Sequence, residues 1–174
     1  MRTVISAILI FVLLLACAGV TCAEDRADIP VTGRIPQMIV MILDTRELVF
    51  DEVDFDYLLG TAHLTRVGVI ATKKQAVKAT ISGNVYYTLS ISAPEEYLTG
   101  TNGGFLHISQ LRWRLPARRD ANGWESISLE RVPVQSGPPG TIEVRFDFQL
   151  TAYWDNPAQT YSGQILLTVI PDGS

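Results

Sequence analysis

The sequence predicts an all-β protein, an antiparallel β-sandwich or barrel of about eight or nine strands after an N-terminal signal helix. Three observations support this prediction. The first 23 residues have the composition of a secretory leader, and no long helical period appears after them. Short segments of alternating polar and apolar residues follow instead, separated by turn residues. The chain is therefore expected to comprise a leader over residues 1–23, an extended arm over residues 24–36 and one β domain over residues 37–174.

The leader begins with the positive pair Met1-Arg2 and continues as an uncharged apolar run from Val4 to Leu15, interrupted only by Ser6. Small residues then lead to a cleavage site after Ala23, which indicates export to the cell surface or the medium. An uncleaved anchor is the alternative, because the apolar stretch reaches the lower limit of a membrane-spanning helix, roughly 17 residues.

Both cysteines, Cys17 and Cys22, lie in this leader. A chain cut after Ala23 has neither a disulfide framework nor thiol chemistry. The stretch from Leu14 to Cys17 also resembles the lipoprotein box of bacteria, in which lipidation of Cys17 would tether the protein to a membrane.

The charge of the chain argues against nucleic-acid binding. The sequence has 14 basic and 18 acidic residues, and loss of Arg2 with the leader leaves 13 against 18, a net charge of −5. Binding to nucleic acid depends on neutralising phosphates with Lys and Arg. The short basic pairs Lys73-Lys74 and Arg118-Arg119 are interpreted as loop charges.

The clearest strand runs from Ile142 to Trp154, where every second residue is apolar and is expected to face the core. In Phe105–Leu115 the apolar parity changes, which predicts a β-bulge near Ser109-Gln110. Turn residues place a hairpin tip at Arg118–Trp124, which would pair Trp113 with Trp124, and a loop at Val134–Gly140. The other predicted strands are Met38–Leu43, Glu47–Phe50, His63–Ala71, Ala76–Ile81, Val85–Ser92, Trp124–Val132 and Tyr161–Ile170.

The acidic run Phe50–Asp56 brings four carboxylates within six residues, namely those of Asp51, Glu52, Asp54 and Asp56. Such oxygen ligands suit Ca²⁺, but the spacing lacks the order of a calcium-binding loop. The run is interpreted as a solvated connection whose Val53 and Phe55 are anchored in the core, and calcium binding stays an alternative.

No catalytic residue, metal ligand or cofactor is expected. His63 and His107 fall on predicted strands, and neither belongs to a metal-binding or nucleophile motif. Glu95-Glu96 and Glu125 form a carboxylate pair for glycoside hydrolysis only if they meet in space.

Three aromatic residues, Tyr153, Trp154 and Tyr161, border a loop near Asn156 and are candidates for stacking on sugars. The same residues can instead close the end of the sandwich. The alternation places Trp154 in the inward set, which favours packing.

The closing stretch "YWDNPAQTYSGQILLTVIP" resembles the last strands of secreted bacterial β-sandwich proteins of the pilin-like and spore-coat-U-like kind. The similarity extends loosely over Pro36–Pro171, with Gln159 standing where a Gly is common. The resemblance implies an immunoglobulin-like sandwich in an extracellular coat, pilus or surface layer, without an active site.

The edge strands of a sandwich carry unpaired backbone groups that invite another strand. In the arm, Ile29, Val31 and Ile35 share one parity, so the arm is a candidate for strand addition to a partner, with a disordered tail as the alternative. The first functional hypothesis is an exported, non-enzymatic structural or assembly protein whose partner is a protein, including a second copy. The alternatives are a monomeric secreted module that binds carbohydrate or protein and, third, a secreted hydrolase. Membrane contact is expected only through the leader or a lipid anchor.

Overall fold

The computed structural model describes residues 30–60, 62–116 and 123–173. The chain divides into two units, Met1–Ile35 and Pro36–Ser174. In the first unit the described residues, 30–35, are exposed and lie in no helix or strand. The predicted leader, Cys17 and Ile29 lie outside the described residues.

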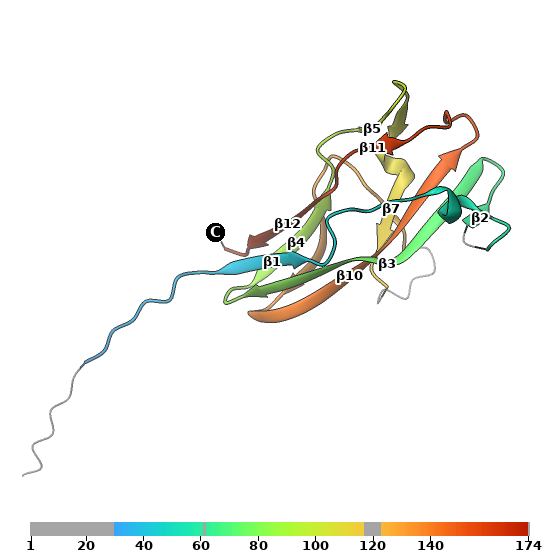
Figure 1. The fold of residues 1–174 in the computed structure, drawn as a ribbon. Helices are drawn as coiled ribbons and strands as arrows, with labels where there is room; N and C mark the ends of the chain where they lie inside the picture. Colours follow the sequence, from blue (N-terminus) through green and yellow to red (C-terminus); the bar gives the residue numbers. More distant parts are fainter. Residues whose placement is uncertain (1–29, 61, 117–122, 174) are drawn as a thin grey trace, which may run out of the picture. The chain divides into compact units, whose positions relative to one another are not determined.

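Three antiparallel sheets build the second unit (Figure 1). The large sheet has the order β1-β3-β10-β7-β8, and β2 also pairs with β3. It consists of β1 (Ile39–Leu43), β2 (Ala62–Leu64), β3 (Gly68–Gly83), β7 (Leu111–Arg114), β8 (Glu125–Ser126) and β10 (Gly140–Tyr153). The second sheet, β12-β4-β9, consists of β4 (Tyr87–Ser92), β9 (Val132–Gly137) and β12 (Leu166–Pro171). The small sheet, β11-β5-β6, consists of β5 (Tyr97–Gly100), β6 (Phe105–His107) and β11 (Tyr161–Ser162). Two 3₁₀ turns, η1 (Glu52–Phe55) and η2 (Ile108–Gln110), complete the described elements.

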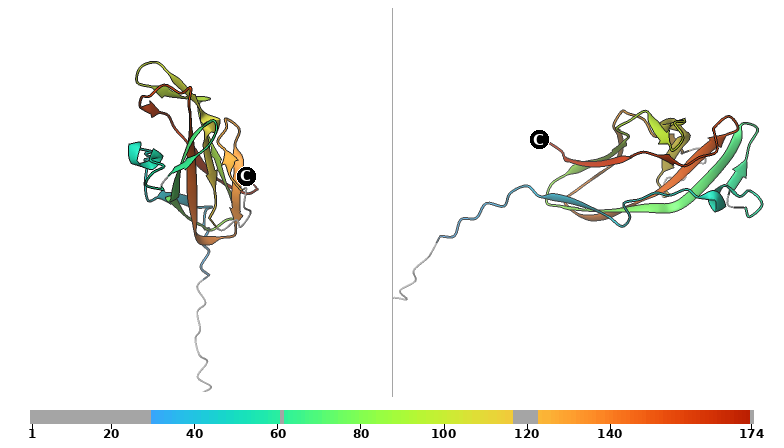
Figure 2. Two further views of the ribbon diagram at one scale, coloured as in Figure 1. Left: turned by 90° about the vertical axis from the view of Figure 1, so that its right-hand side faces the viewer. Right: turned by 45° about the horizontal axis from the view of Figure 1, so that its top comes forward.

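The large and second sheets pack face to face over one hydrophobic core, and the two layers are visible in both views of Figure 2. The large sheet contributes Trp113, Phe146 and Phe148. The ring centroid of Phe146 lies 6.0 Å from that of Trp113 and 6.1 Å from that of Phe148. The second sheet contributes Tyr87, Leu89 and Ile91. The structure therefore confirms the predicted all-β fold as a two-layer antiparallel sandwich.

The long strand β10 follows the predicted alternation in its buried residues except at Asp147 and Thr151. This carboxylate was expected to face water, yet only 2% of Asp147 is exposed. The register of β10 against β3 shifts between Phe146 and Phe148, and the bulge contains Gln75 with φ of 50°. The Gln75 N–H donates to Asp147 Oδ1 at 2.8 Å, and Arg114 Nε donates to Oδ2 at 3.0 Å. Asp147 is buried because its two oxygens hold this bulge together.

A 3₁₀ turn, not the predicted β-bulge, changes the parity within Phe105–Leu115. Strand β6 ends at His107, η2 follows, and β7 begins at Leu111. Leu106 and Trp113 are both buried although their parities differ.

Several predicted boundaries are wrong. Glu47–Phe50 forms no strand, and Lys73-Lys74 lies inside β3, not in a loop. The predicted loop Val134–Gly140 contains most of β9 and the start of β10, and β5 was not predicted. Pairing with a neighbouring strand decides these segments, and their composition alone does not reveal it.

Trp113 and Trp124 do not form the predicted pair. Trp113 is buried against Phe146, whereas the Trp124 ring lies under the Arg114 guanidinium at 4.4 Å. Most of the predicted hairpin tip before Trp124 lies outside the described residues.

Candidate functional site: two unpaired strand edges

Strand β1 exposes one edge of its backbone. Among the described residues it pairs with β3 alone. The Asn84 N–H donates to Met38 O at 3.0 Å, and the Asp44 N–H donates to Lys78 O at 3.1 Å. Hydrogen-bonded and non-hydrogen-bonded pairs alternate in an antiparallel ladder. The backbone N–H and C=O groups of the even-numbered residues of β1 therefore point toward β3. The backbone groups that point toward the free edge belong to Ile39, Met41 and Leu43.

Strand β12 exposes an edge in the same way. Within the described part of the chain it pairs with β4 alone. The Asp172 N–H donates to Tyr86 O at 2.8 Å, which places even-numbered residues of β12 in the bonded set. The N–H and C=O groups of Leu167 and Val169 therefore point away from β4.

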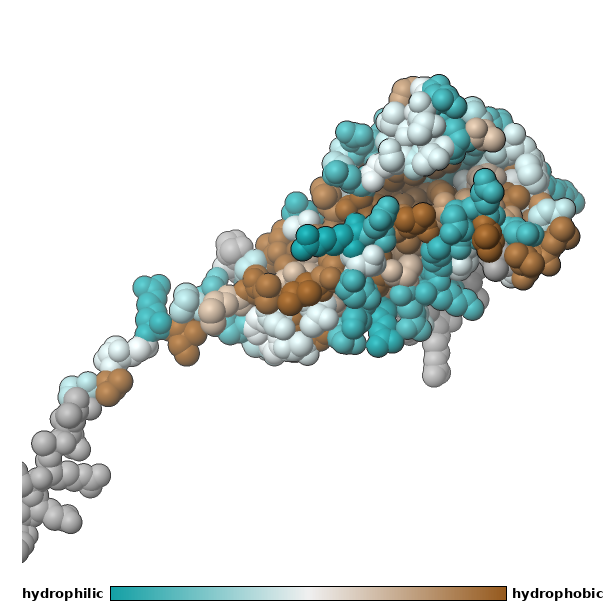
Figure 3. Space-filling view, in the orientation of Figure 1, coloured by the Kyte–Doolittle hydropathy of each residue, from teal (hydrophilic) through white to brown (hydrophobic). Residues whose placement is uncertain are grey.

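These two free edges lie on the same side of the sandwich, because β1 and β12 contact each other across the two sheets. The residues whose backbone is free also point their side chains at the core, where they remain only partly buried. Figure 3 shows hydrophobic surface around β1 on this side of the domain. We call this side the open side and define it by Ile39, Met41, Leu43, Leu167 and Val169. It offers backbone donors and acceptors next to incompletely buried apolar side chains, which are the two components that bind an added strand.

The described part of the arm carries exposed apolar side chains. Val31 is 91% and Ile35 is 79% exposed, and the two residues lie four positions apart, so they share one parity. Pro30 and Pro36 both have the opposite parity. In an extended arm, all N–H groups on the Val31 side are therefore intact, so this side can form a complete ladder with one edge strand.

The acidic run forms η1 and its caps. Asp51 accepts the N–H groups of Val53 and Asp54, Asp54 Oδ2 accepts the Asp51 N–H at 2.9 Å, and Asp56 accepts the Leu58 N–H at 2.8 Å. Lys73 Nζ lies 2.8 Å from Asp54 Oδ2 and joins η1 to β3. These carboxylates are thus engaged by backbone donors and a lysine.

One part of the interpretation of this run is wrong. Val53 is 60% exposed and is not anchored in the core, because the short turn of η1 points it outward. Phe55 is partly buried, with its ring 6.4 Å from that of Phe50.

His63 and His107 lie on strands, as predicted, and His107 has polar neighbours. Its Nδ1 accepts the Ser109 N–H at 3.1 Å and lies 2.7 Å from Ser109 Oγ, while Nε2 lies 3.4 Å from Glu96 Oε1. The imidazole caps η2, and about half of the His107 side chain is exposed. Glu96 adjoins the small sheet whereas Glu125 begins β8 of the large sheet.

The three candidate aromatics separate. Tyr153 ends β10 and is partly exposed on the outer face of the large sheet. Tyr161 begins β11, and its hydroxyl donates to Pro157 O at 2.8 Å. Trp154 is 62% exposed, so its predicted inward orientation is wrong. The chain leaves the sheet at this point, and the indole Nε1 instead donates to Arg66 O at 3.1 Å.

Residues 30–60, 62–116 and 123–173 contain no cluster of three metal-ligating side chains. No helix there has the length and hydropathy needed to cross a membrane.

No protein-family model matches this chain, and no curated protein matches it either.

The sequence alone indicated that edge strands would be exposed but not which strands form the edges. The signal that was present is the absence of charge in "IVMIL" of β1 and "LLTVIP" of β12. An edge strand in a monomer usually carries a charge or an early proline.

Proposed function

We propose that this chain is an exported, non-enzymatic structural subunit of a surface or extracellular assembly, and that subunits join by strand addition. In this proposal the arm of one copy adds to the open side of the next copy. The observation that carries the proposal is the open side itself, where two neighbouring edge strands each have one backbone edge without a partner in the described chain.

The chemistry of the arm supports this choice of occupant. Val31 and Ile35 would face the core of the receiving copy and cover Met41 and Val169, while Thr32 and Arg34 would face water. A fully buried Val or Ile side chain contributes roughly 1.5–3 kcal/mol relative to an exposed one. The backbone ladder gives affinity for an extended segment, and the alternate side chains give register.

Sedimentation velocity and electron microscopy of the chain beginning at Glu24 test the proposal. We expect particles whose mass increases with protein concentration. A charge at an inward arm position should prevent this association, because an unpaired buried carboxylate is strongly unfavourable. We therefore expect Val31→Asp to be monomeric at concentrations at which the parent chain associates.

The matched control is Thr32→Asp, which introduces the same charge one residue later, on the parity that faces water. It should associate like the parent chain. Strictly monomeric parent protein at high concentration, or equal behaviour of the two variants, contradicts assembly through the arm.

A further inference from the structure

A trough crosses the outer face of the large sheet, the face turned away from the core. It has a volume of about 380 Å³ and runs from the turn between β2 and β3, across β3 and β10, to β7 and β8. Small-molecule sites have volumes of about 300–1,000 Å³. The polar residues Gln110, Arg112, Ser126 and Thr151 line it together with the ring of Tyr153.

Among the described residues, Arg112 is the only charged residue that lines the trough. It is half-buried, and its Nη2 donates to the Trp124 carbonyl at 2.6 Å. Its Nε is buried and has no hydrogen-bond partner among the described residues. A guanidinium has five N–H donors. The protein therefore satisfies Arg112 incompletely and, in the described part of the chain, places no carboxylate within ion-pair distance of it.

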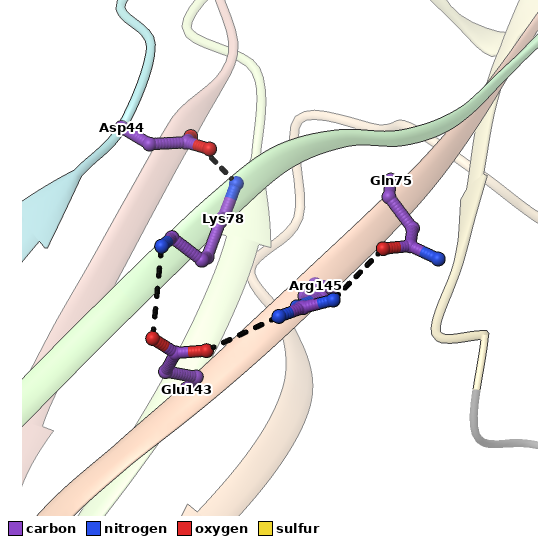
Figure 4. Close-up of polar contacts among 5 residues, drawn as sticks. All are labelled: Asp44, Gln75, Lys78, Glu143 and Arg145. Carbon is purple, nitrogen blue, oxygen red and sulfur yellow. Dashed lines mark hydrogen bonds and ion pairs between the residues drawn. The ribbon is translucent and has the colours of Figure 1, made fainter.

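Three other cations of the large sheet, Arg114, Lys78 and Arg145, each contact a carboxylate. Arg114 lies two residues from Arg112 on β7 and contacts Asp147 at 3.0 Å. Lys78 Nζ lies 3.6 Å from Glu143, and Arg145 contacts both Glu143 and Gln75 (Figure 4). Arg112 thus differs from these three cations in having no carboxylate partner among the described residues, and its charge is complementary to a negatively charged ligand.

The remaining lining indicates what kind of anion fits. The Tyr153 side chain is partly exposed and supplies an aromatic wall. Gln110 is held in place, since its Nε2 donates to Thr151 O at 3.2 Å and to Asn156 Oδ1 at 2.9 Å. An aromatic ring beside fixed polar groups matches a sugar ring, which has apolar C–H faces and hydroxyl groups.

We propose that the trough binds an acidic saccharide, a sugar chain bearing carboxylates of the uronic acid type. Arg112 binds a carboxylate of the ligand through the free part of its guanidinium fork, which suits carboxylate geometry. Tyr153 packs against a sugar face. The trough lies on the outer face of the large sheet and not at the open side, so saccharide binding and strand addition are independent of each other.

Isothermal titration calorimetry of the chain beginning at Glu24 tests this inference, with oligogalacturonate and its methyl ester as probes. We expect the oligogalacturonate to bind and the ester, which lacks the charges, to bind at least tenfold more weakly. Arg112→Gln should weaken oligogalacturonate binding about 10- to 100-fold, the size of a hydrogen bond to a charged group. Raising the salt concentration should also weaken binding.

Two further variants separate this effect from misfolding. Arg145→Gln removes a paired, exposed arginine elsewhere on the same sheet and should bind like the parent chain. Ser126→Asp places a carboxylate directly opposite Arg112 in the ladder and should weaken binding without removing the guanidinium. The inference is overturned by no binding to the parent chain, by unchanged affinity in Arg112→Gln, or by equal affinity for a poly-glutamate peptide.

Discussion

The two lateral sides of the sandwich end in different kinds of strand. On one side, β8 has only two residues, and β9 contains Pro133 next to a register shift. On the open side, β1 and β12 have five and six residues, no charged side chain, and a proline only as the last residue of β12. Very short strands, prolines and bulges are the devices that keep edge strands from pairing with other chains. The domain is protected on the β8/β9 side and left unprotected on the β1/β12 side.

This difference shows where a second chain can be accepted. A free edge that is also apolar is an aggregation hazard in a monomer. Here the free apolar edge occurs on one side only, and the apolar residues of the arm share one parity. A sandwich that receives one strand from a neighbouring copy requires both features.

The largest expected effect comes from introducing into β12 a proline of the kind that protects the edge of β9. Val169→Pro removes an N–H that points to the free edge and takes no part in the β4 ladder. We expect this variant to retain its stability while its association, followed by sedimentation velocity, falls at least tenfold.

The matched substitution one residue later should behave in the opposite way. Ile170 has the parity of Asp172, so its N–H belongs to the ladder with β4. Ile170→Pro should therefore lower the free energy of unfolding by about 3 kcal/mol in urea titrations. The substitution removes the N–H hydrogen bond to β4 and leaves the accepting carbonyl of β4 without a donor. If both prolines have the same effect on stability, the assigned parity of β12 is wrong.

The next comparison is between the stability costs of Gly→Ala substitutions on the two sides, which depend on the space around each glycine. On the protected side, a Cβ at Gly137 would lie 2.5 Å from the hydroxyl of Tyr87 and 2.7 Å from its ring. That ring is fully buried, and its burial raises the pKa of the Tyr87 hydroxyl. Gly137→Ala should destabilise the domain by about 1–3 kcal/mol in urea titrations, because the closed core cannot shift to admit a methyl group.

On the open side, Gly83→Ala should cost less. Its Cβ would lie 2.9 Å from the carbonyl oxygen of Met38, just before β1, and 3.2 Å from the side chain of Ile39, the first residue of β1. This edge can move outward, and the lower entropy of unfolded alanine offsets about 0.4–1 kcal/mol. We expect a net cost below about 1 kcal/mol, and an equal cost at the two glycines would contradict the idea that the open side yields.

Side-chain parity could be predicted from the sequence wherever a strand is regular. Val144, Phe146 and Phe148 are buried as the alternation of β10 requires. Asp147 could not be predicted, because its burial depends on a bulge in β3, 72 residues away, at a Gln that carries no turn signal. Exposed Trp154 was also missed, since the alternation was extended one residue past the end of the strand.

The candidate sites were predictable only in part. The parity of Val31 and Ile35 is visible in the sequence, but the edge that would receive the arm depends on the strand order. The local sequence does not indicate that Arg112 lacks a carboxylate partner. Arg114 lies on the same strand with the same parity, and it differs from Arg112 in lying opposite Asp147. Which arginine keeps its charge unpaired is a property of strand register, and register is a long-range property of the fold.

The smallest predicted effect concerns the segment that follows β1, which is attached to the large sheet through η1. Burial acts to raise the pKa of Asp54, but the hydrogen bonds from Lys73 and from the Asp51 N–H, with the charge of Lys73, hold it below its ordinary value. A carboxyl group with a lowered folded-state pKa stabilises the fold above its unfolded-state pKa, near 3.8, and loses this contribution as the pH falls through the folded-state value.

Lys73→Met should therefore lower the free energy of unfolding by about 1 kcal/mol or less at pH 7, the size of a partly exposed ion pair. This decrease in the free energy of unfolding should become smaller below about pH 4 in urea titrations, because protonated Asp54 no longer attracts Lys73. Lys74→Met, which changes the exposed neighbouring lysine, should have no such pH-dependent effect, and a pH-independent loss in Lys73→Met would show that its methylenes and not its charge hold η1 to β3.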